Sequence, residues 1–309
     1  MPTTAERPSP EGVRTVFFLS DYGIQDEFVG VVHAVVAARA PGTTVIDLTH
    51  EIPPFDVRAG CHALMRAVPH LGPGVVLAVV DPGVGTMRRG VAFEVARPAG
   101  GGTLFFVGPD NGLLVAAAEA AGEAPLARVV ELHREPVPPD RGATFDGRDV
   151  FAPAAAALCA GAPLGDLGEE VDPDSLVRLI GGVVEHGRLG DGRSCLRAEV
   201  TWVDRFGNLQ LAATEADARV AGLPSAGSIE LVTLAGGEGA GGEHGADRLP
   251  RALVPDGVQL RCVATYGELK HGELGLLVDA NGHIAVVAGE ASAAHWLNVM
   301  AGELLVLAW

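Results

Sequence analysis

The chain has 309 residues, of which 48% are hydrophobic and 20% charged, a composition typical of a globular protein with one large or two smaller domains. Its formal net charge of −17 repels phosphate backbones and anionic headgroups, so we expect neither nucleic acid nor a membrane as a partner. The first residues lack the apolar core of a signal peptide, and no apolar run is long enough to span a bilayer. The four cysteines are far apart in the sequence and include no Cys-x-x-Cys pair, which favours free thiols and a cytoplasmic protein.

The first half of the chain alternates short apolar runs with helical patterns. Residues 1–12 are Pro-rich and polar and are expected to form a flexible tail, followed by an α/β domain over residues 13–180. Apolar strands without polar alternation, separated by helices, predict a mostly parallel sheet covered on both faces. The expected strands are Thr15–Leu19, Thr43–Leu48, Val75–Val80, Val91–Val95 and Leu104–Val107, and the expected helices are Glu27–Ala40, Val57–Ala67 and Gly112–Ala121.

The pattern changes after residues 166–190, a segment rich in Gly, Asp and Glu that we interpret as a linker. Residues 190–309 are predicted to form an all-β domain that closes into a small barrel. Asp279–Gly282 (Asp-Ala-Asn-Gly) is a hairpin turn signal, and residues 235–248 form a Gly-rich loop. The expected strands are Ala198–Leu211, Ser228–Leu234, Val258–Ala264 and Glu273–Val287.

Several of the predicted parallel strands end in an acidic residue. Asp21 and Asp81 each follow an apolar strand, and Asp110 follows another. Ligands of open α/β sheets bind beyond the carboxyl ends of the strands, so Asp21 and Asp81 would face one crevice if their strands are neighbours. Aspartate is also a common helix cap and turn former, and the pattern alone does not decide between these two interpretations.

Three segments are more distinctive. The first, Ser20–Asp26, places two carboxylates five residues apart around a glycine turn. The second, Val80–Arg89, is a Gly-rich loop after a strand, but it has neither the P-loop ending nor the dinucleotide-binding fingerprint. Within it, Arg88 can fold back toward Asp81. The third, Thr144–Asp149, is a charged cluster that precedes an apolar run.

These segments resemble the S-adenosylmethionine (SAM) hydroxide adenosyltransferases, a family related to the fluorinating and chlorinating SAM enzymes. The resemblance runs from about residue 16 to 294 and is carried by FFLSDYGIQDEFVG, VVDPGVGTMRRG, FVGPDNGLL, TFDGRDVFAPAAA and VDRFGNLQL. It implies an N-terminal α/β domain, a C-terminal β-barrel, and a homotrimer with SAM between neighbouring subunits. The implied reaction is water attack at the ribose C5′, giving adenosine and methionine without a metal or other cofactor.

The resemblance also implies which residues of the N-terminal domain bind the substrate. Asp21 matches the residue that holds the ribose hydroxyls, and a carboxylate suits a vicinal diol because it accepts two hydrogen bonds. Asp26 matches a partner of the methionyl ammonium, and Phe55 an aromatic position near the ribose, although Phe55 could instead be an ordinary core residue. Phe145 is also expected to be a substrate-binding residue.

On the barrel side, Asp204, Phe206 and Asn208 match the family's Asp-x-Phe-Gly-Asn motif. Asn208 would bind the adenine edge, which needs both a donor and an acceptor, and Phe206 and Tyr266 would flank the ring. The alternative is that Phe-Gly-Asn is only a β-turn.

The water-activating residues of the family are an Asp, an Arg and a His. Asp81 and Arg88 match the first two, but Asp146 stands where the family has His. Two neighbouring carboxylates raise the pKa of one of them, and such a carboxylate can accept a proton from water. His50, His133 and His283 are other groups that could replace the missing histidine in space.

Three other functions stay open. Asp146 is compatible with a catalytically silent SAM-binding protein. A SAM-dependent halogenase is disfavoured, because the Asp81 carboxylate would repel a halide. A metal-dependent hydrolase built from Asp21, Asp26 and Asp81 lacks any familiar histidine spacing.

Overall fold

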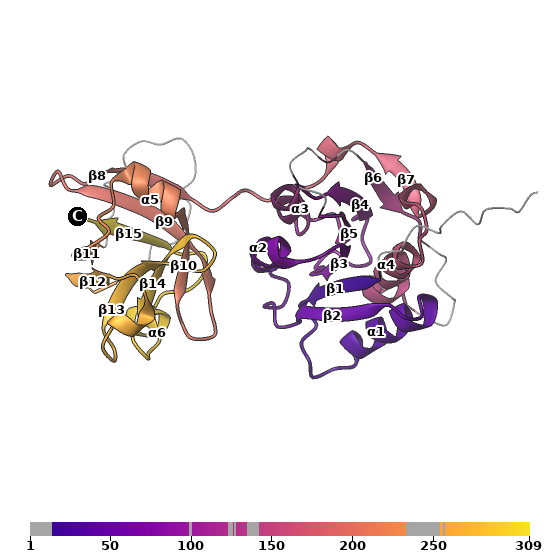
Figure 1. Cartoon of the computed structure of the whole chain (residues 1–309), viewed down its shortest axis with the longest axis horizontal. Coiled ribbons are helices and arrows are strands. Elements are labelled where there is room, and N and C mark those ends of the chain that lie inside the picture. The colour runs from indigo at the N-terminus through magenta and orange to yellow at the C-terminus, as the bar shows by residue number, and fades with distance from the viewer. Residues whose placement is uncertain are drawn as a thin grey trace, which may run out of the picture. The chain divides into compact units, whose positions relative to one another are not determined.

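The computed structural model describes residues 14–98, 101–122, 126, 128–134, 142–232, 254–255 and 257–309. The expected tail at 1–12 and the Gly-rich loop at 235–248 lie outside these residues. The chain divides into two compact units, one ending at Leu179 and the other running from Ile180 to Trp309 (Figure 1). None of the described helices is long and apolar enough to cross a membrane.

Unit 1 is built on a seven-stranded sheet in the order β2-β1-β3-β5-β4-β6-β7. The neighbouring pairs among β2, β1, β3 and β5 are parallel, whereas β4 is antiparallel to both β5 and β6, and β7 to β6. Most strands therefore run in one direction, which confirms the predicted mostly parallel sheet. The strands are β1 (Thr15–Ser20), β2 (Thr44–Thr49), β3 (Gly74–Val79), β4 (Gly90–Ala96), β5 (Thr103–Pro109), β6 (Val129–Leu132) and β7 (Gly168–Val171).

The reversed direction of β4 follows from short connections. Only residues 97–102 separate β4 from β5, too few for the helical crossover that parallel neighbours require. The two strands therefore form a hairpin.

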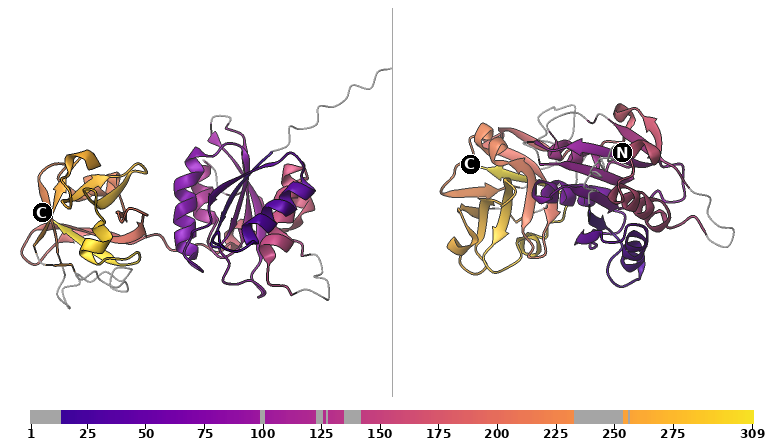
Figure 2. Two further views of the ribbon diagram at one scale, coloured as in Figure 1. Left: turned by 90° about the horizontal axis from the view of Figure 1, so that it is seen from below. Right: turned by 45° about the vertical axis from the view of Figure 1, so that its right-hand side comes forward.

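Helices cover both faces of this sheet (Figure 2). On one face α1 (Phe28–Arg39) packs against α4 (Ala152–Cys159), and on the other α2 (Val57–Ala67) packs against α3 (Val115–Ala121). The side chains of β3 between them are fully buried. A π-helical turn, η3 (Gly147–Phe151), leads directly into α4, and such turns are frequent at functional sites.

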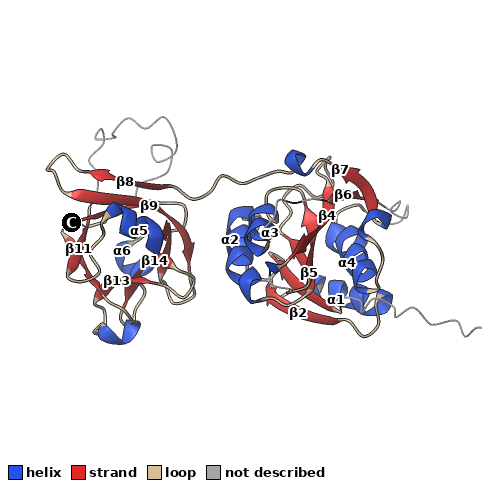
Figure 3. Cartoon of the chain, turned by 45° about the horizontal axis from the view of Figure 1, so that its top comes forward, coloured by secondary structure: helices blue, strands red, loops and turns tan. Residues whose placement is uncertain are grey.

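Unit 2 is a closed barrel with little helix (Figure 3). Seven strands pair in the ring β10-β14-β13-β12-β11-β15-β9, which β9 closes by pairing with β10, and β8 adds to β9 from outside. The predicted β-barrel is thus confirmed, and closure removes the exposed edges of an open sheet. The elements are β8 (Val184–Arg188), β9 (Ser194–Val203), β10 (Leu209–Thr214), α5 (Glu215–Ala221), β11 (Ser228–Leu231), β12 (Val258–Cys262), η7 (Tyr266–Glu268), β13 (Leu274–Val278), β14 (His283–Ala288), α6 (Ala293–Leu297) and β15 (Leu304–Ala308).

Two sequence interpretations are wrong in detail. The expected strand 198–211 is a hairpin, because β9 and β10 are joined by a turn at residues 204–208. The expected linker 166–190 contains β7 and β8, which pair with β6 and β9. Both are edge strands with sequences GEEV and VEHGR, whose charged, partly exposed side chains hide the usual apolar pattern.

Candidate active site

Asp21 and Asp81 lie together at one edge of the unit 1 sheet. Each follows one of the neighbouring parallel strands β1 and β3, where Ser20 is paired with Val79. The chain passes from β1 to β2 on one side of β1 and then to β3 on its other side. The point where the strand order reverses in this way is the usual ligand position in such sheets. Both carboxylates line a cavity of ≈ 250 Å³, together with Tyr22, Phe28, Pro54, Phe55, Val79, Val84, Thr144, Phe145, Asp146 and Gly147.

Arg88 joins two of these carboxylates. Its Nε donates to Asp81 Oδ1 at 3.0 Å, and its Nη2 donates to Asp81 Oδ2 and, at 2.7 Å, to Asp146 Oδ2. The three side chains are buried, with exposed fractions of 8% for Arg88, 6% for Asp81 and 5% for Asp146. Buried charges are retained when they are paired and hydrogen-bonded in this way.

The environment makes Asp81 a stronger base than an ordinary aspartate. Burial raises the pKa of its carboxyl, Arg88 opposes that effect, and the neighbouring Asp146 charge adds to it, with a net rise. The Gly83 N–H also donates to Asp81 Oδ1 at 3.2 Å, which fixes the carboxylate on the Gly-rich loop. A buried carboxylate with a raised pKa is suited to accept a proton at neutral pH.

Arg134 is a member of this network that the sequence reasoning missed. Its Nη1 donates to Asp146 Oδ1 at 3.2 Å, its Nη2 lies 2.9 Å from Asp146 Oδ2, and Nη2 also donates to the Arg88 carbonyl at 3.3 Å. Two carboxylates thus meet two guanidinium groups, and their formal charges cancel. Arg134 follows the short strand β6, and no motif or spacing marked it.

Phe55 is held in an uncommon backbone conformation at the cavity. Its φ is 68°, a left-handed value that costs energy for a residue with a side chain. Its N–H donates to Asp21 Oδ2 at 2.9 Å, and the residue is 71% exposed. The alternative interpretation of Phe55 as an ordinary core residue is therefore wrong.

An aromatic cluster forms another wall of the cavity. Tyr22, Phe28 and Phe145 contact one another with ring centroids 5.2–5.8 Å apart. Gly147 is required beside them, because a Cβ there would lie 2.1 Å from the Tyr22 hydroxyl. Burial, followed by the charge of Asp21, raises the pKa of Tyr22, so its phenol stays neutral. Sequence reasoning did not select Tyr22 or Phe28, although Tyr22 directly follows Asp21.

Other candidates lie elsewhere. Asp26 is exposed in the turn before α1 and does not line the cavity. No histidine is among the described lining residues: His50 contacts Ser20, His283 contacts the Leu211 carbonyl in unit 2, and His133 is exposed after β6. Asp110 instead pairs with Arg89 at 2.5 Å and accepts from the Val177 N–H at 2.8 Å, which indicates a structural role.

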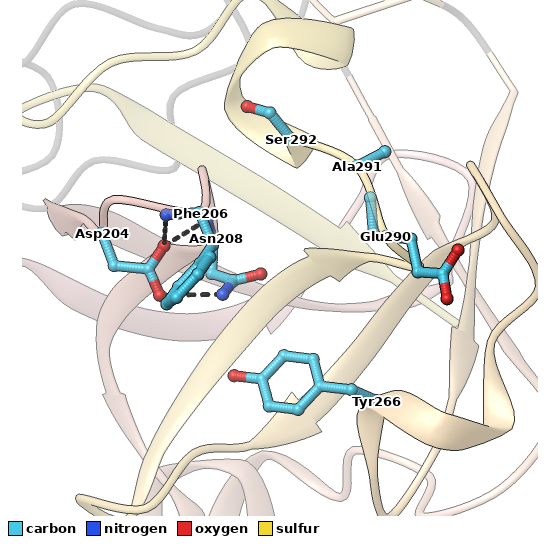
Figure 4. A pocket seen from close by; sticks show the side chains of 8 residues that line it. Asp204, Phe206, Asn208, Tyr266, Glu290, Ala291 and Ser292 are labelled. Atoms are coloured by element: carbon cyan, nitrogen blue, oxygen red, sulfur yellow. Dashed lines mark hydrogen bonds between the residues drawn. The ribbon is translucent and has the colours of Figure 1, made fainter.

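Unit 2 carries a second pocket, of ≈ 700 Å³, around the turn between β9 and β10 (Figure 4). Asp204 Oδ1 accepts from the N–H groups of Phe206 and Asn208 at 2.8 and 2.9 Å, and its Oδ2 accepts from Asn208 Nδ2 at 2.8 Å. Asp204 therefore shapes the turn and orients the Asn208 amide, and Phe206 is left 76% exposed. The segment is a turn, as the alternative interpretation holds, and it also lines a pocket.

Tyr266 and Ser292 line the same pocket. The Tyr266 side chain, at the start of η7, points toward the turn that carries Phe206 and Asn208 (Figure 4). Gly207 has a φ of 82°, and a Cβ there would lie 1.9 Å from Ser292 Oγ, so only glycine fits between the turn and α6.

Comparisons with known proteins agree with both units. The family model described as SAM hydroxide adenosyltransferase N-terminal domain matches residues 16–168, and that of the C-terminal domain matches residues 198–306. The chain belongs to the SAM hydroxide adenosyltransferase family.

Its relatives include proteins named (R)-S-adenosyl-L-methionine hydrolase. That of Salinispora tropica is 43% identical over 94% of this chain and 96% of its own length, and that of Salinispora arenicola is 41% identical over the same shares. A protein named fluorinase from an Actinoplanes species is 25% identical over 93% of this chain and 95% of its own. The crystal structure of an uncharacterized conserved protein from Thermotoga maritima matches with a TM-score of 0.75 and 27% identity, over 94% of this chain and 99% of that one.

Proposed function

We propose that this protein is a SAM hydrolase that attacks the ribose C5′ with water and releases adenosine and L-methionine. The observation that carries the proposal is the buried Asp81–Arg88–Asp146 network beside Asp21, at the carboxyl edge of the sheet. The relatives that cover nearly the whole chain carry the name of this activity.

The proposed reaction is an in-line displacement. The water oxygen forms a bond to C5′ while the C5′–S bond breaks, and its electron pair leaves with sulfur as the neutral thioether of methionine. Asp81 accepts the proton that water loses. A sulfonium needs no acid to leave, so catalysis consists of placing the water and the C–S bond and keeping bulk solvent away. We propose that no metal or other cofactor takes part.

The two pockets support most of the substrate contacts that we propose. We assign Asp21 to the ribose hydroxyls, and Phe55 and Phe145 to the walls around the sugar. We also assign Asp26, which lies outside the cavity, to the methionyl ammonium, and this assignment rests on the family resemblance alone. In unit 2 we assign Asn208 to the adenine edge and Phe206 and Tyr266 to its faces. Asp204 acts by orienting Asn208, since both of its oxygens are engaged in the turn.

The residues assigned to the ribose belong to unit 1, and those assigned to the adenine belong to unit 2. We propose that they meet between neighbouring subunits of a homotrimer, which would bury the exposed ring of Phe206 against substrate. We also propose a cytoplasmic location, which the free thiols of all four cysteines support.

The other functions are less well supported. A halogenase would have to bind a halide beside the Asp81 carboxylate. A metal-dependent hydrolase would need Asp21, Asp26 and Asp81 to converge, and Asp26 does not line the cavity. A silent SAM-binding protein is disfavoured because the relatives that match nearly the whole chain are named for the hydrolase activity.

Product analysis tests the proposal. Purified protein is incubated with SAM in the presence of chelator, and adenosine, methionine and methylthioadenosine are separated. We expect equal amounts of adenosine and methionine, with no halogenated adenosine when chloride or fluoride is added. Tight SAM binding without products would support the silent protein, and activity that returns only with added metal would support the metal hydrolase.

A further inference from the structure

Three potential ligand side chains converge at the edge of unit 1, outside the cavity described above. His33 belongs to α1, Asp47 to β2, and His50 directly follows β2. His33 Nε2 lies 2.8 Å from Asp47 Oδ1, and His50 Nε2 lies 3.0 Å from the same oxygen. The three ligand atoms are all within 4.8 Å of one another.

His50 carries the strongest indication of a ligand. Its side chain is only 5% exposed, and its Nε2, 3.0 Å from Asp47 Oδ1, is a buried atom that meets no hydrogen-bond criterion with any described residue. Buried polar atoms usually have a partner, so this nitrogen requires an explanation.

The other ring nitrogen of His50 is already engaged. Nδ1 lies 2.8 Å from Ser20 Oγ, which also accepts from the Tyr22 N–H at 3.3 Å. With an ion bound, Nδ1 would carry the imidazole proton and donate it to Ser20 Oγ, and Nε2 would present its lone pair to the ion between Asp47 and His33. Metal-bound histidines are held in this way, with the second nitrogen donating to an oxygen.

We propose that His33, Asp47 and His50 bind a divalent transition-metal ion, with Zn²⁺ as the best match. Two imidazoles and one carboxylate are a familiar zinc ligand set, and water would supply the fourth ligand. With bonds of about 2.0–2.1 Å, tetrahedral zinc places its ligand atoms roughly 3.3 Å apart. Asp47 Oδ1 lies 2.8 and 3.0 Å from the two imidazole nitrogens, close to that spacing.

The exposure and charge of the cluster suit metal entry. The side chains of His33 and Asp47 are 35% and 42% exposed, which gives the ion a path from solvent. The Asp47 carboxylate would supply one negative charge to the ion, and its Oδ1 is the atom that both imidazoles approach.

The bound ion would act on structure rather than on the reaction. It would tie α1 to β2, and the His50 carbonyl accepts from the Gly23 N–H at 2.8 Å. Through that bond and Ser20, the cluster supports the segment that carries Asp21. Because none of the three ligands lines the cavity, hydrolysis in chelator and zinc binding are independent of each other.

Titration of the full chain without a histidine tag tests this site. After removal of metal by chelator, calorimetry with Zn²⁺ should show one ion per chain, and Zn²⁺ should raise the melting temperature. His33→Ala and Asp47→Asn should each weaken binding at least about tenfold, as should Ser20→Ala, which removes the support of His50. His70→Ala, an exposed histidine of the same unit, should bind as the parent does.

Two results would overturn the proposal. One is the absence of saturable Zn²⁺ binding by the folded parent chain, which would leave Asp47 as a hydrogen-bond partner of His33 only. The other is equal affinity of the parent, His33→Ala and Asp47→Asn, which would place the ion elsewhere. Because the measurement is binding, neither result depends on whether the protein hydrolyses SAM.

Discussion

Arg134 contacts both carboxylate oxygens of Asp146, at 3.2 and 2.9 Å, while Arg88 contacts Asp146 from another direction at 2.7 Å. The family resemblance leads us to expect a histidine where this chain has Asp146. An added negative charge beside Asp81 would be costly on its own, and Arg134 neutralises it. The departure from the family motif is therefore accommodated by a residue outside the motif.

Removing Arg134 should shift the pH dependence of catalysis. Arg134→Met would leave two buried carboxylates with one guanidinium, and one carboxyl pKa should rise. If Asp81 must be ionised to accept a proton, activity is lost as the pH falls through its pKa, so the acid limb of the kcat profile should move to higher pH. Arg128→Met, which removes a surface pair with Glu170, is the matched control and should leave the profile in place. An unchanged profile in Arg134→Met would show that Arg134 has no influence on the base.

Asp146→Asn should reduce turnover with little effect on SAM affinity. In the parent protein the negative charge of Asp146 raises the pKa of Asp81. The amide keeps the shape of the side chain but removes this charge, so the pKa of Asp81 falls and Asp81 becomes a weaker base. Since Asp81, Arg88 and Asp146 share hydrogen bonds, the effects of Asp81→Asn and Asp146→Asn on kcat should not add. Steady-state kinetics of the two single variants and the double variant measure this coupling. Additive losses would mean that the residues act separately.

Asp21 and Asp26 should differ in the ligands they recognise. Asp21→Ala should weaken SAM and adenosine alike, because both contain the ribose diol. Asp26→Ala should weaken only SAM, because only SAM carries the ammonium. Each lost charged hydrogen bond should cost about 1.5–3 kcal/mol, or roughly ten- to a hundredfold in affinity. Calorimetric titration with both ligands compares them, and equal effects of Asp26→Ala on the two would refute its assignment.

Phe55 should show a conflict between stability and binding. Its left-handed backbone is unfavourable for phenylalanine but not for glycine, so Phe55→Gly should unfold no more easily than the parent, with a gain of up to about 1 kcal/mol. The same change removes the exposed ring and should raise KM for SAM. Phe55→Ala separates the two effects, since it loses the ring and keeps the strain. A destabilised Phe55→Gly variant with unchanged KM would show that the ring serves packing instead.

The shared position of Asp21 and Asp81 follows a general rule, although the sequence pattern alone left a role as helix caps or turn formers equally open. Apolar strands mark the sheet, acids mark the strand ends, and parallel neighbours place those ends at one edge. Phe55 was selected through the family resemblance, but nothing in the sequence predicted its left-handed φ or the hydrogen bond from its N–H to Asp21.

Other features had no local signal. Arg134 reaches Asp146 across twelve positions of the sequence, and this contact exists only once the segments after β6 and before η3 are brought together by the fold of unit 1. Likewise, the edge strands β7 and β8 are charged, so hydrophobic periodicity cannot mark them. The cluster of His33, Asp47 and His50 joins a helix to a strand, with no metal-binding spacing in the sequence.

The most direct test of the proposed reaction is the fate of the water oxygen. The protein is incubated with SAM and chelator in water labelled with heavy oxygen, and the products are analysed by mass spectrometry. Attack at C5′ predicts that the label appears in the 5′-hydroxyl of adenosine, and that methionine, formed in equal amount, carries none. Unlabelled adenosine, or methylthioadenosine as the enzymatic product, would contradict the proposal.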